Sequence, residues 1–347
     1  MMNDQGEGVS RRDFLRFGAG AAVGAVAATV VPELSQNSEQ QERQEFFDTI
    51  KGLTYDDLKN PDQEKLKRFS EACAREYLKI TSTQGITVED LVNNAAFHST
   101  QEEFVGAVRN SGLPNYPSDR NAYAHNFYDS KRIDVNLGLI SNNLHMETEY
   151  PGVKLFDTLI HEWVEVRAVE NTTGEFLNSP QEVLITGETS EQWARYRGGR
   201  VYTEGGHYGL LNFDNAWDQL ITRRILMESL RDDLTLLGAS VTVSSVNGIA
   251  EETDKLSRIV ERAGISTQEM AILYANSDVE GMLARMGSVF KDSALETLSE
   301  VNRGGRTEEE IKSQKDFLLG KRAAFLISSK RWDDYGEMID HIRPPTQ

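Results

Sequence analysis

The chain has little cysteine, little basic charge and no long, strongly apolar run. Its 347 residues include one cysteine, so no disulfide can form within the chain. Lys and Arg total 37 against 55 Asp and Glu, which gives a formal net charge of -18. This acidic protein is therefore not expected to bind nucleic acid or an anionic membrane surface. The sequence also lacks a phosphate-binding P-loop and a Gly-x-Ser-x-Gly nucleophile elbow.

The N-terminal region carries a targeting pattern. Ser10-Arg11-Arg12-Asp13-Phe14-Leu15-Arg16 precedes a Gly- and Ala-rich apolar stretch over residues 17–31. This looks like a twin-arginine export signal, a type of signal peptide read by the twin-arginine export machinery. We therefore expect residues 1–35 to be the signal and the start of a linker, and the protein to be periplasmic or extracellular. Ala25-Val26-Ala27 offers a cleavage site, whereas an uncleaved signal would leave the protein membrane-anchored.

Composition and periodicity predict a mainly helical α+β protein with a small sheet. Residues 36–45 are rich in Ser, Gln, Asn and Glu, which predicts a disordered linker. A helical region is expected over 46–119, a mixed core over 120–235 and a second helical region over 236–347. Within the core, residues 132–140 alternate apolar and polar side chains, which predicts a half-buried strand.

A helix predicted from about residue 153 to 170 contains the candidate chemistry. His161 and Glu165 are four residues apart, so they share one helix face and could coordinate one metal ion. The segment resembles the H-E-x-x-H zinc motif, with Glu165 in place of the second histidine. In that motif the histidines bind zinc, and the glutamate matching Glu162 activates the metal-bound water.

The surroundings of this helix extend the resemblance. The strand over 132–140 precedes it, and a later predicted helix reads Asn215-Ala216 through Leu220-Ile221-Thr222. From about residue 120 to 230 the chain resembles a zincin metalloprotease of the gluzincin kind. The resemblance implies a zincin-like fold and an exported, metal-dependent hydrolase, with Glu162 as general base. A peptide-like substrate would then lie along the 132–140 strand through backbone pairing.

The third metal ligand is less clear. The family's usual glutamate falls on Asn215, so Asp214 and His207 are the alternatives. We expect His161 and Glu165 to converge with an acid or histidine from residues 204–218. A site with one nitrogen and two oxygen ligands would accept zinc, but it would also tolerate manganese, calcium or iron.

A non-catalytic reading of the same segment is also open. The chain could be an exported binding protein, with a surface partner, on a zincin scaffold that has lost its metal. Pairing of Glu165 with an arginine such as Arg167 or Arg223 would favour that reading.

Overall fold

The computed structural model describes ten parts of the chain. They are residues 30–82, 85–111, 113–127, 132–144, 150–170, 211–244, 249–276, 278–291, 294 and 307–342. The signal motif with Arg11 and Arg12, and the alternative ligand His207, lie outside these residues. No helix in the described parts is long and apolar enough to cross a membrane.

The chain divides into two compact units, residues 1–45 and residues 46–347. In the first unit the described residues, 30–45, are helical and belong to α2 (Val30–Gly52). The segment over 36–45, expected to be a linker, is part of this helix. Gln and Glu dominate it, and these residues favour helix as well as solvent, so a polar composition does not distinguish coil from exposed helix.

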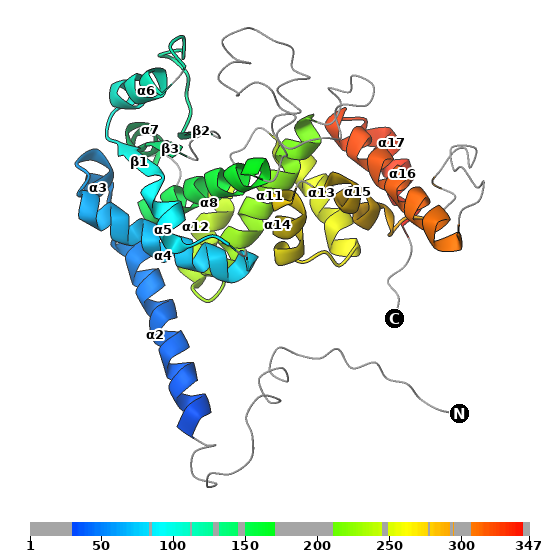
Figure 1. Ribbon diagram of the computed structural model, residues 1–347, viewed down its shortest axis with the longest axis horizontal. Helices are drawn as coiled ribbons and strands as arrows, with labels where there is room; N and C mark the ends of the chain where they lie inside the picture. The colour runs from blue at the N-terminus through cyan, green and yellow to red at the C-terminus, as the bar shows by residue number, and fades with distance from the viewer. Residues whose placement is uncertain are drawn as a thin grey trace. The chain divides into compact units, whose positions relative to one another are not determined.

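The second unit is mainly helical, with a small mixed sheet, as the sequence predicted (Figure 1). Its described helices are α3 (Tyr55–Lys59), α4 (Gln63–Thr81), α5 (Val88–Asn93), α6 (Gln101–Asn110), α7 (Leu137–Leu144), α8 (Pro151–Glu170), α11 (Leu211–Leu230), α12 (Leu234–Ser244), α13 (Ala250–Arg262), α14 (Thr267–Ala275), α15 (Val279–Gly287), α16 (Glu308–Ser328) and α17 (Trp332–Ile339). Its described strands are β1 (Ala95–His98), β2 (Ala124–Phe127) and β3 (Arg132–Asn136).

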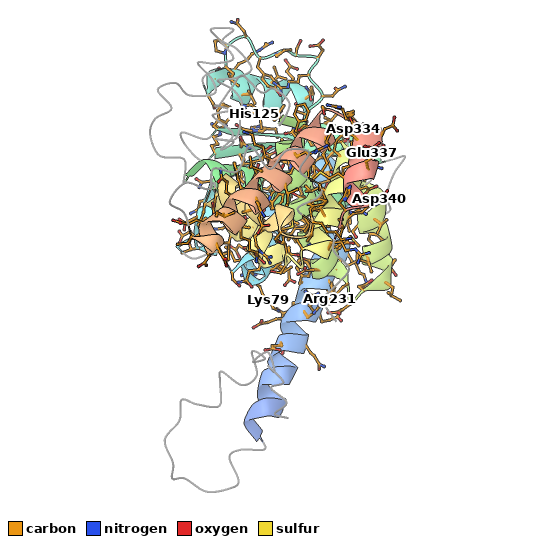
Figure 2. The ribbon with its side chains drawn as sticks, turned by 90° about the vertical axis from the view of Figure 1, so that its right-hand side faces the viewer. Lys79, His125, Arg231, Asp334, Glu337 and Asp340 are labelled. Atoms are coloured by element: carbon orange, nitrogen blue, oxygen red, sulfur yellow. The ribbon has the colours of Figure 1, made fainter. Side chains whose placement is uncertain are left out.

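The sheet has the order β1-β3-β2, with β1 parallel and β2 antiparallel to the central β3. Its two faces line different cores. Ile133 and Val135 belong to the large core that includes α8 and α11. Phe127 belongs to a smaller cluster with Phe104 and Tyr116. His125 on β2 pairs with Asp134 on β3, and both alternate with the residues that face the large core. Figure 2 labels His125.

The strand predicted over 132–140 is right only as far as Asn136. Residues 137–144 form α7 instead, because the Asn136 side-chain oxygen accepts a hydrogen bond from the Leu139 N–H at 3.0 Å. This is the geometry of an N-cap, and asparagine is a preferred residue there. Strand β1 also lies in a region that was predicted to be helical, since four residues are too few to show a clear alternation.

Helix α8 lies at the centre of the large core. Every residue from 151 to 166 is buried except His161, which is half-buried. Its largest buried side chains include Trp163 and Phe156, and four charged residues are buried with them: Lys154, Asp157, Glu162 and Glu165. Helix α11 packs beside α8, and α14 and α4 also contact it (Figure 1). Any polar side chain on α8 is therefore held in a largely dry environment.

Helices α15 and α16 approach each other through glycine. A Cβ added to Gly320 would lie 1.8 Å from the Leu283 carbonyl oxygen, and one added to Gly287 would lie 1.7 Å from that of Asp316. Real Cβ atoms do not come this close, so the two backbones can touch only because both residues lack a side chain. This contact anchors the C-terminal helices to one another.

Candidate metal centre

The site is built on one face of α8. His161 and Glu165 are one helical turn apart, so their side chains point to the same side, as the sequence predicted. The Glu165 side chain is 9% exposed and that of His161 is 28% exposed. Among residues 151–166 of α8, His161 is the one that is not buried.

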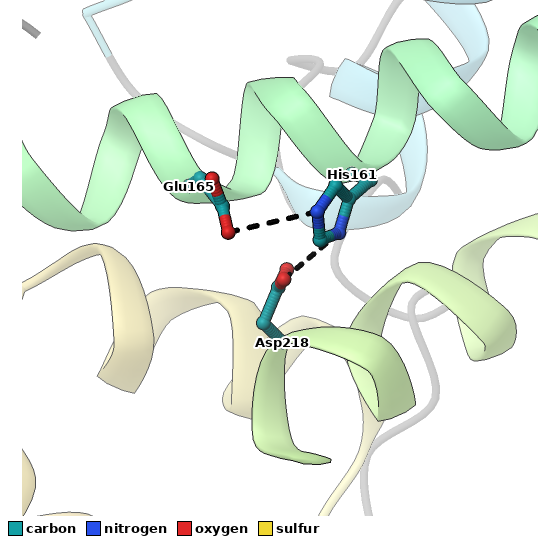
Figure 3. A group of neighbouring side chains, drawn as sticks. All are labelled: His161, Glu165 and Asp218. Atoms are coloured by element: carbon teal, nitrogen blue, oxygen red, sulfur yellow. Dashed lines mark ion pairs between the residues drawn. The ribbon is translucent and has the colours of Figure 1, made fainter. Parts of the chain in front are cut away.

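Helix α11 supplies a third ligand-type side chain, Asp218. Its Oδ2 lies 2.8 Å from Nδ1 of His161, while Oε1 of Glu165 lies 3.6 Å from Nε2 of the same ring (Figure 3). The imidazole therefore stands between two carboxylates, one facing each ring nitrogen. One potential ligand atom from each of the three residues lies within 4.8 Å of the other two. His161, Glu165 and Asp218 form a group that could hold a metal ion.

The chemistry of these donors fits a metal ion. Asp218 is 1% exposed, and its Oδ1 has no hydrogen-bond partner among the described residues. A buried carboxylate oxygen without a partner is unfavourable by about 1–3 kcal/mol, and a bound cation would remove that penalty. Metal bonds of about 2.0–2.2 Å require tetrahedral donors about 3.4 Å apart, so the side chains would close in modestly on binding.

Nδ1 of His161 faces two neighbours, Oδ2 of Asp218 at 2.8 Å and the side-chain amide of Gln219 at 3.2 Å. With the ring proton on Nδ1, the ring donates it to Asp218; with the proton on Nε2, Nδ1 accepts a hydrogen bond from the Gln219 amide. Nε2 faces Glu165 at 3.6 Å. To bind an ion together with Nε2, Asp218 would exchange its hydrogen bond with Nδ1 for a bond to the ion.

Glu162 is buried on the flank of the site and is held by the sheet. Its Oε2 accepts a hydrogen bond of 2.9 Å from Nδ2 of Asn126 on β2. The same nitrogen donates at 2.8 Å to Oε2 of Glu165. With backbone and side chain taken together, Glu162, Glu165 and Asn126 are 5%, 7% and 6% exposed. The site holds three carboxylates, those of Glu162, Glu165 and Asp218, and one imidazole. With the carboxylates ionised, its net charge is negative whether or not His161 is protonated.

The described residues add Asp218 to the candidates for a third ligand, and the predictions of Asp214 and His207 stay predictions. Asp218 lies within the expected range of 204–218, but the motif comparison pointed to Asp214 or Asn215. Asp214 begins the same face of α11 one turn earlier, and its side chain lies outside the described residues, as does His207. The missed signal was the i, i+4 repeat of aspartate at 214 and 218 on a helix expected to follow the His161 helix.

Arg223, named above as a competing partner for Glu165, pairs with Asp254 at 2.8 Å. The side chain of Arg167, the other named competitor, lies outside the described residues.

A second polar cluster lies on the opposite face of the sheet. Asp134 on β3 is fully buried, and its Oδ1 contacts Nε2 of His98 at 2.6 Å and Nη2 of Arg132 at 2.7 Å. His125 on β2 pairs with Asp134 in register. Burial lowers the pKa of His125 to about 4, Arg120 lowers it further, and Asp134 opposes the shift. These residues contact the small aromatic cluster and are separated from α8 by the sheet.

Comparisons of the chain with protein-family models, with curated proteins and with solved structures gave no match. The chain is therefore described by its own structure: a mainly helical α+β domain with a mixed sheet of three strands in its described part. Its His/Glu/Asp group could bind a metal ion.

Proposed function

We propose that the protein is an exported, metal-dependent hydrolase that resembles zincin peptidases and acts on a peptide-like substrate. The observation that carries this proposal is the convergence of His161 and Glu165 from α8 with Asp218 from α11. The order of strand, His-Glu helix and acidic helix supports the resemblance stated for residues 120–230, and the buried setting supports catalysis.

The ion would be held by His161, Glu165 and Asp218. One nitrogen and two carboxylate oxygens form a harder donor set than the two histidines and one carboxylate of many catalytic zinc sites. We therefore propose a divalent metal, with zinc, manganese and iron as the ions to test first. Such an ion would polarise the substrate carbonyl and supply a bound water, which two anionic ligands make less acidic than in a site with more histidines.

Glu162 is the proposed general base. It follows His161 directly, so it lies to the side of the ligand face rather than on it. The hydrogen bond from Asn126 holds its carboxylate beside Glu165, the neighbouring ligand. A glutamate in this place can accept the proton of the attacking water and return it to the leaving amine.

The substrate cannot lie along β3 as the sequence suggested. β3 is the central strand, and its neighbours β1 and β2 occupy both of its hydrogen-bonding edges. Among the described strands β2 pairs only with β3, and β2 carries Asn126, which contacts the site. We propose the outer edge of β2 as the place where an extended peptide pairs with the protein.

Metal content and peptide cleavage test this function together. The purified chain would be loaded with zinc, manganese or iron and incubated with a mixed peptide library, with cleavage read by mass spectrometry. We expect one metal per chain, and loss of metal in the His161→Ala and Asp218→Leu variants. Glu162→Gln should retain metal and lose about 10²–10⁴-fold in rate. Asp157→Asn, which changes a buried acid on the same helix, is the matched control and should retain both.

Two outcomes would redirect the proposal. Metal binding without cleavage of any peptide would favour the non-catalytic exported binding protein on the same scaffold. Equal metal content in the parent chain and His161→Ala would remove the site.

Export is proposed from the Arg11-Arg12 motif and is tested separately. Residues 1–35 would be fused to a reporter that is active only after folded export. We expect export of the parent fusion and its loss when Arg11 and Arg12 are both replaced by Lys. Equal export of the two fusions would contradict this route.

A further inference from the structure

We infer that Asn126 is a positioning residue of the metal centre: it determines which oxygen of Glu165 faces the ion and keeps Glu162 beside the ion as a base. This inference rests on the proposed metal site, but it concerns a residue on a different element. Neither the H-E-x-x-E segment nor its spacing points to Asn126, which lies 35 residues before His161.

A single nitrogen joins the sheet to both glutamates. Nδ2 of Asn126 carries two hydrogens, and it contacts Oε2 of Glu162 at 2.9 Å and Oε2 of Glu165 at 2.8 Å. One hydrogen can therefore serve each carboxylate. Hydrogen bonds to ionised carboxylates are about twice as strong as neutral ones, and these two are buried.

This contact orients Glu165. With Oε2 engaged by Asn126, it is Oε1 that faces Nε2 of His161 at 3.6 Å. A carboxylate without such a restraint can rotate and bind a metal through either oxygen or both. Asn126 therefore favours binding through Oε1 alone, and it holds the Glu162 carboxylate away from the ligand position that Glu165 fills.

The location of Asn126 argues against a purely structural role. In the sheet register it pairs with Ile133, so it lies on the face that lines the large apolar core. A buried amide at such a position is unfavourable unless its hydrogens are satisfied, and a leucine of similar size would suit the core. The described partners of its Nδ2 are the two site glutamates, so its polarity serves the site.

The test measures metal affinity and the spectrum of bound cobalt in the full chain. Asn126→Leu should weaken zinc and cobalt binding by about 10- to 100-fold, the usual effect of removing a group that orients a ligand. It should also change the visible absorption of bound Co²⁺, because the Glu165 carboxylate would bind differently. Asn136→Leu controls for damage to the sheet: the Asn136 Nδ2 bonds to Gln101 and the Ala122 carbonyl, and its Oδ1 caps α7, so this variant should lose stability without touching the site glutamates. Metal binding is then compared for the folded fraction of each variant. Asn136→Leu should leave affinity and spectrum unchanged.

A double-mutant comparison separates positioning from general damage to the fold. In a Glu165→Gln background the effect of Asn126→Leu on metal affinity should largely vanish, because the carboxylate that it orients is already gone. In a Glu162→Gln background the effect should persist. An equal effect in both backgrounds, or an unchanged cobalt spectrum in Asn126→Leu, would overturn the inference.

The failure of this inference is distinguishable from the failure of the proposed function. If the parent chain binds metal through His161 and Asp218 while Asn126→Leu binds as tightly, only the role of Asn126 is refuted. If the parent chain binds neither zinc nor cobalt at His161, the metal site and this inference both fail.

Discussion

Replacing Asp218 with asparagine should stabilise the metal-free protein and destabilise the metal-loaded one relative to the parent chain. Asp218 is 1% exposed, its Oδ1 is without a partner among the described residues, and it lies close to Glu165 in an anionic group. Asparagine has nearly the same shape, and its side-chain oxygen can still accept the hydrogen bond from Nδ1 of His161. The substitution therefore removes a buried charge and keeps the packing.

The two opposing effects can be estimated. Removing the buried charge should raise the free energy of unfolding by about 2 kcal/mol, after allowance for the asparagine amide that replaces Oδ1 without a described partner. Weakening the 2.8 Å bond to His161 should lower it by about 1 kcal/mol. The net gain without metal is then about 1 kcal/mol, or a rise in Tm of about 2–3 °C for a chain of this size. Metal at 100 times its Kd would stabilise the parent chain by about 2.7 kcal/mol and would not stabilise the variant. With metal, the parent chain should be more stable by about 2 kcal/mol.

Thermal unfolding in a chelator and in excess zinc measures both states, and the two melting curves should exchange order. Asp157→Asn provides the matched control because Asp157 is also buried but lies 3.3 Å from the ammonium of Lys154. That variant should lose about 3 kcal/mol with or without metal, since Lys154 is left buried beside a neutral group. If Asp218→Asn is less stable than the parent in chelator as well, Asp218 is a structural partner of His161 and the metal argument is wrong.

Two further predictions concern the rest of the fold. Gly320→Ala should lower the free energy of unfolding by about 3 kcal/mol or more, because its Cβ would overlap the Leu283 carbonyl. A Cβ at Gly336 on α17 meets nothing within 4 Å, so Gly336→Ala is the control and should leave the Tm unchanged or raise it. Burial lowers the pKa of His125 to about 4, so in acid the unfolded chain takes up its proton before the folded one. His125 should thus contribute a loss of stability as pH falls from about 6.5 towards 4, and denaturant titrations of His125→Gln should show a shallower fall; an equal slope would contradict this.

The elements that sequence could predict are those with long apolar periodicity. Helices α8 and α11 were expected within a few residues of their observed limits because each combines a long pattern with flanking breaks. Strand β3 was predicted, but its end was not, since the alternation of Leu137 and Leu139 continues the strand pattern into α7. One hydrogen bond, from the Leu139 N–H to the Asn136 side chain, sets the start of α7. A pattern of apolar residues gives no information about a single capping hydrogen bond.

Residues of the site that share a helix could be predicted, and those that depend on tertiary contacts could not. The spacing of His161 and Glu165 follows directly from helical geometry. Asn126 could not be found in this way, because its role depends on the register of β2 against β3 and on the packing of that sheet face against α8. Buried amides of this kind carry no local signature, so only the folded chain identifies them.

The choice between Asp214 and Asp218 shows how packing selects a ligand. The two aspartates are four residues apart, so they share one face of α11 and differ by about 6 Å along its axis. Which of them meets His161 depends on how far α11 slides along α8, and that register is set by buried side chains such as Trp217, Leu220 and Ile221. Alignment of this helix with the zincin ligand-helix motif, residue by residue, favours position 214 or 215 as the metal ligand. The packed core brings Asp218 to within 2.8 Å of the imidazole. Asp218 is 1% exposed, and burial of this degree strengthens the attraction of its carboxylate for a cation and increases the destabilisation expected when no cation is bound.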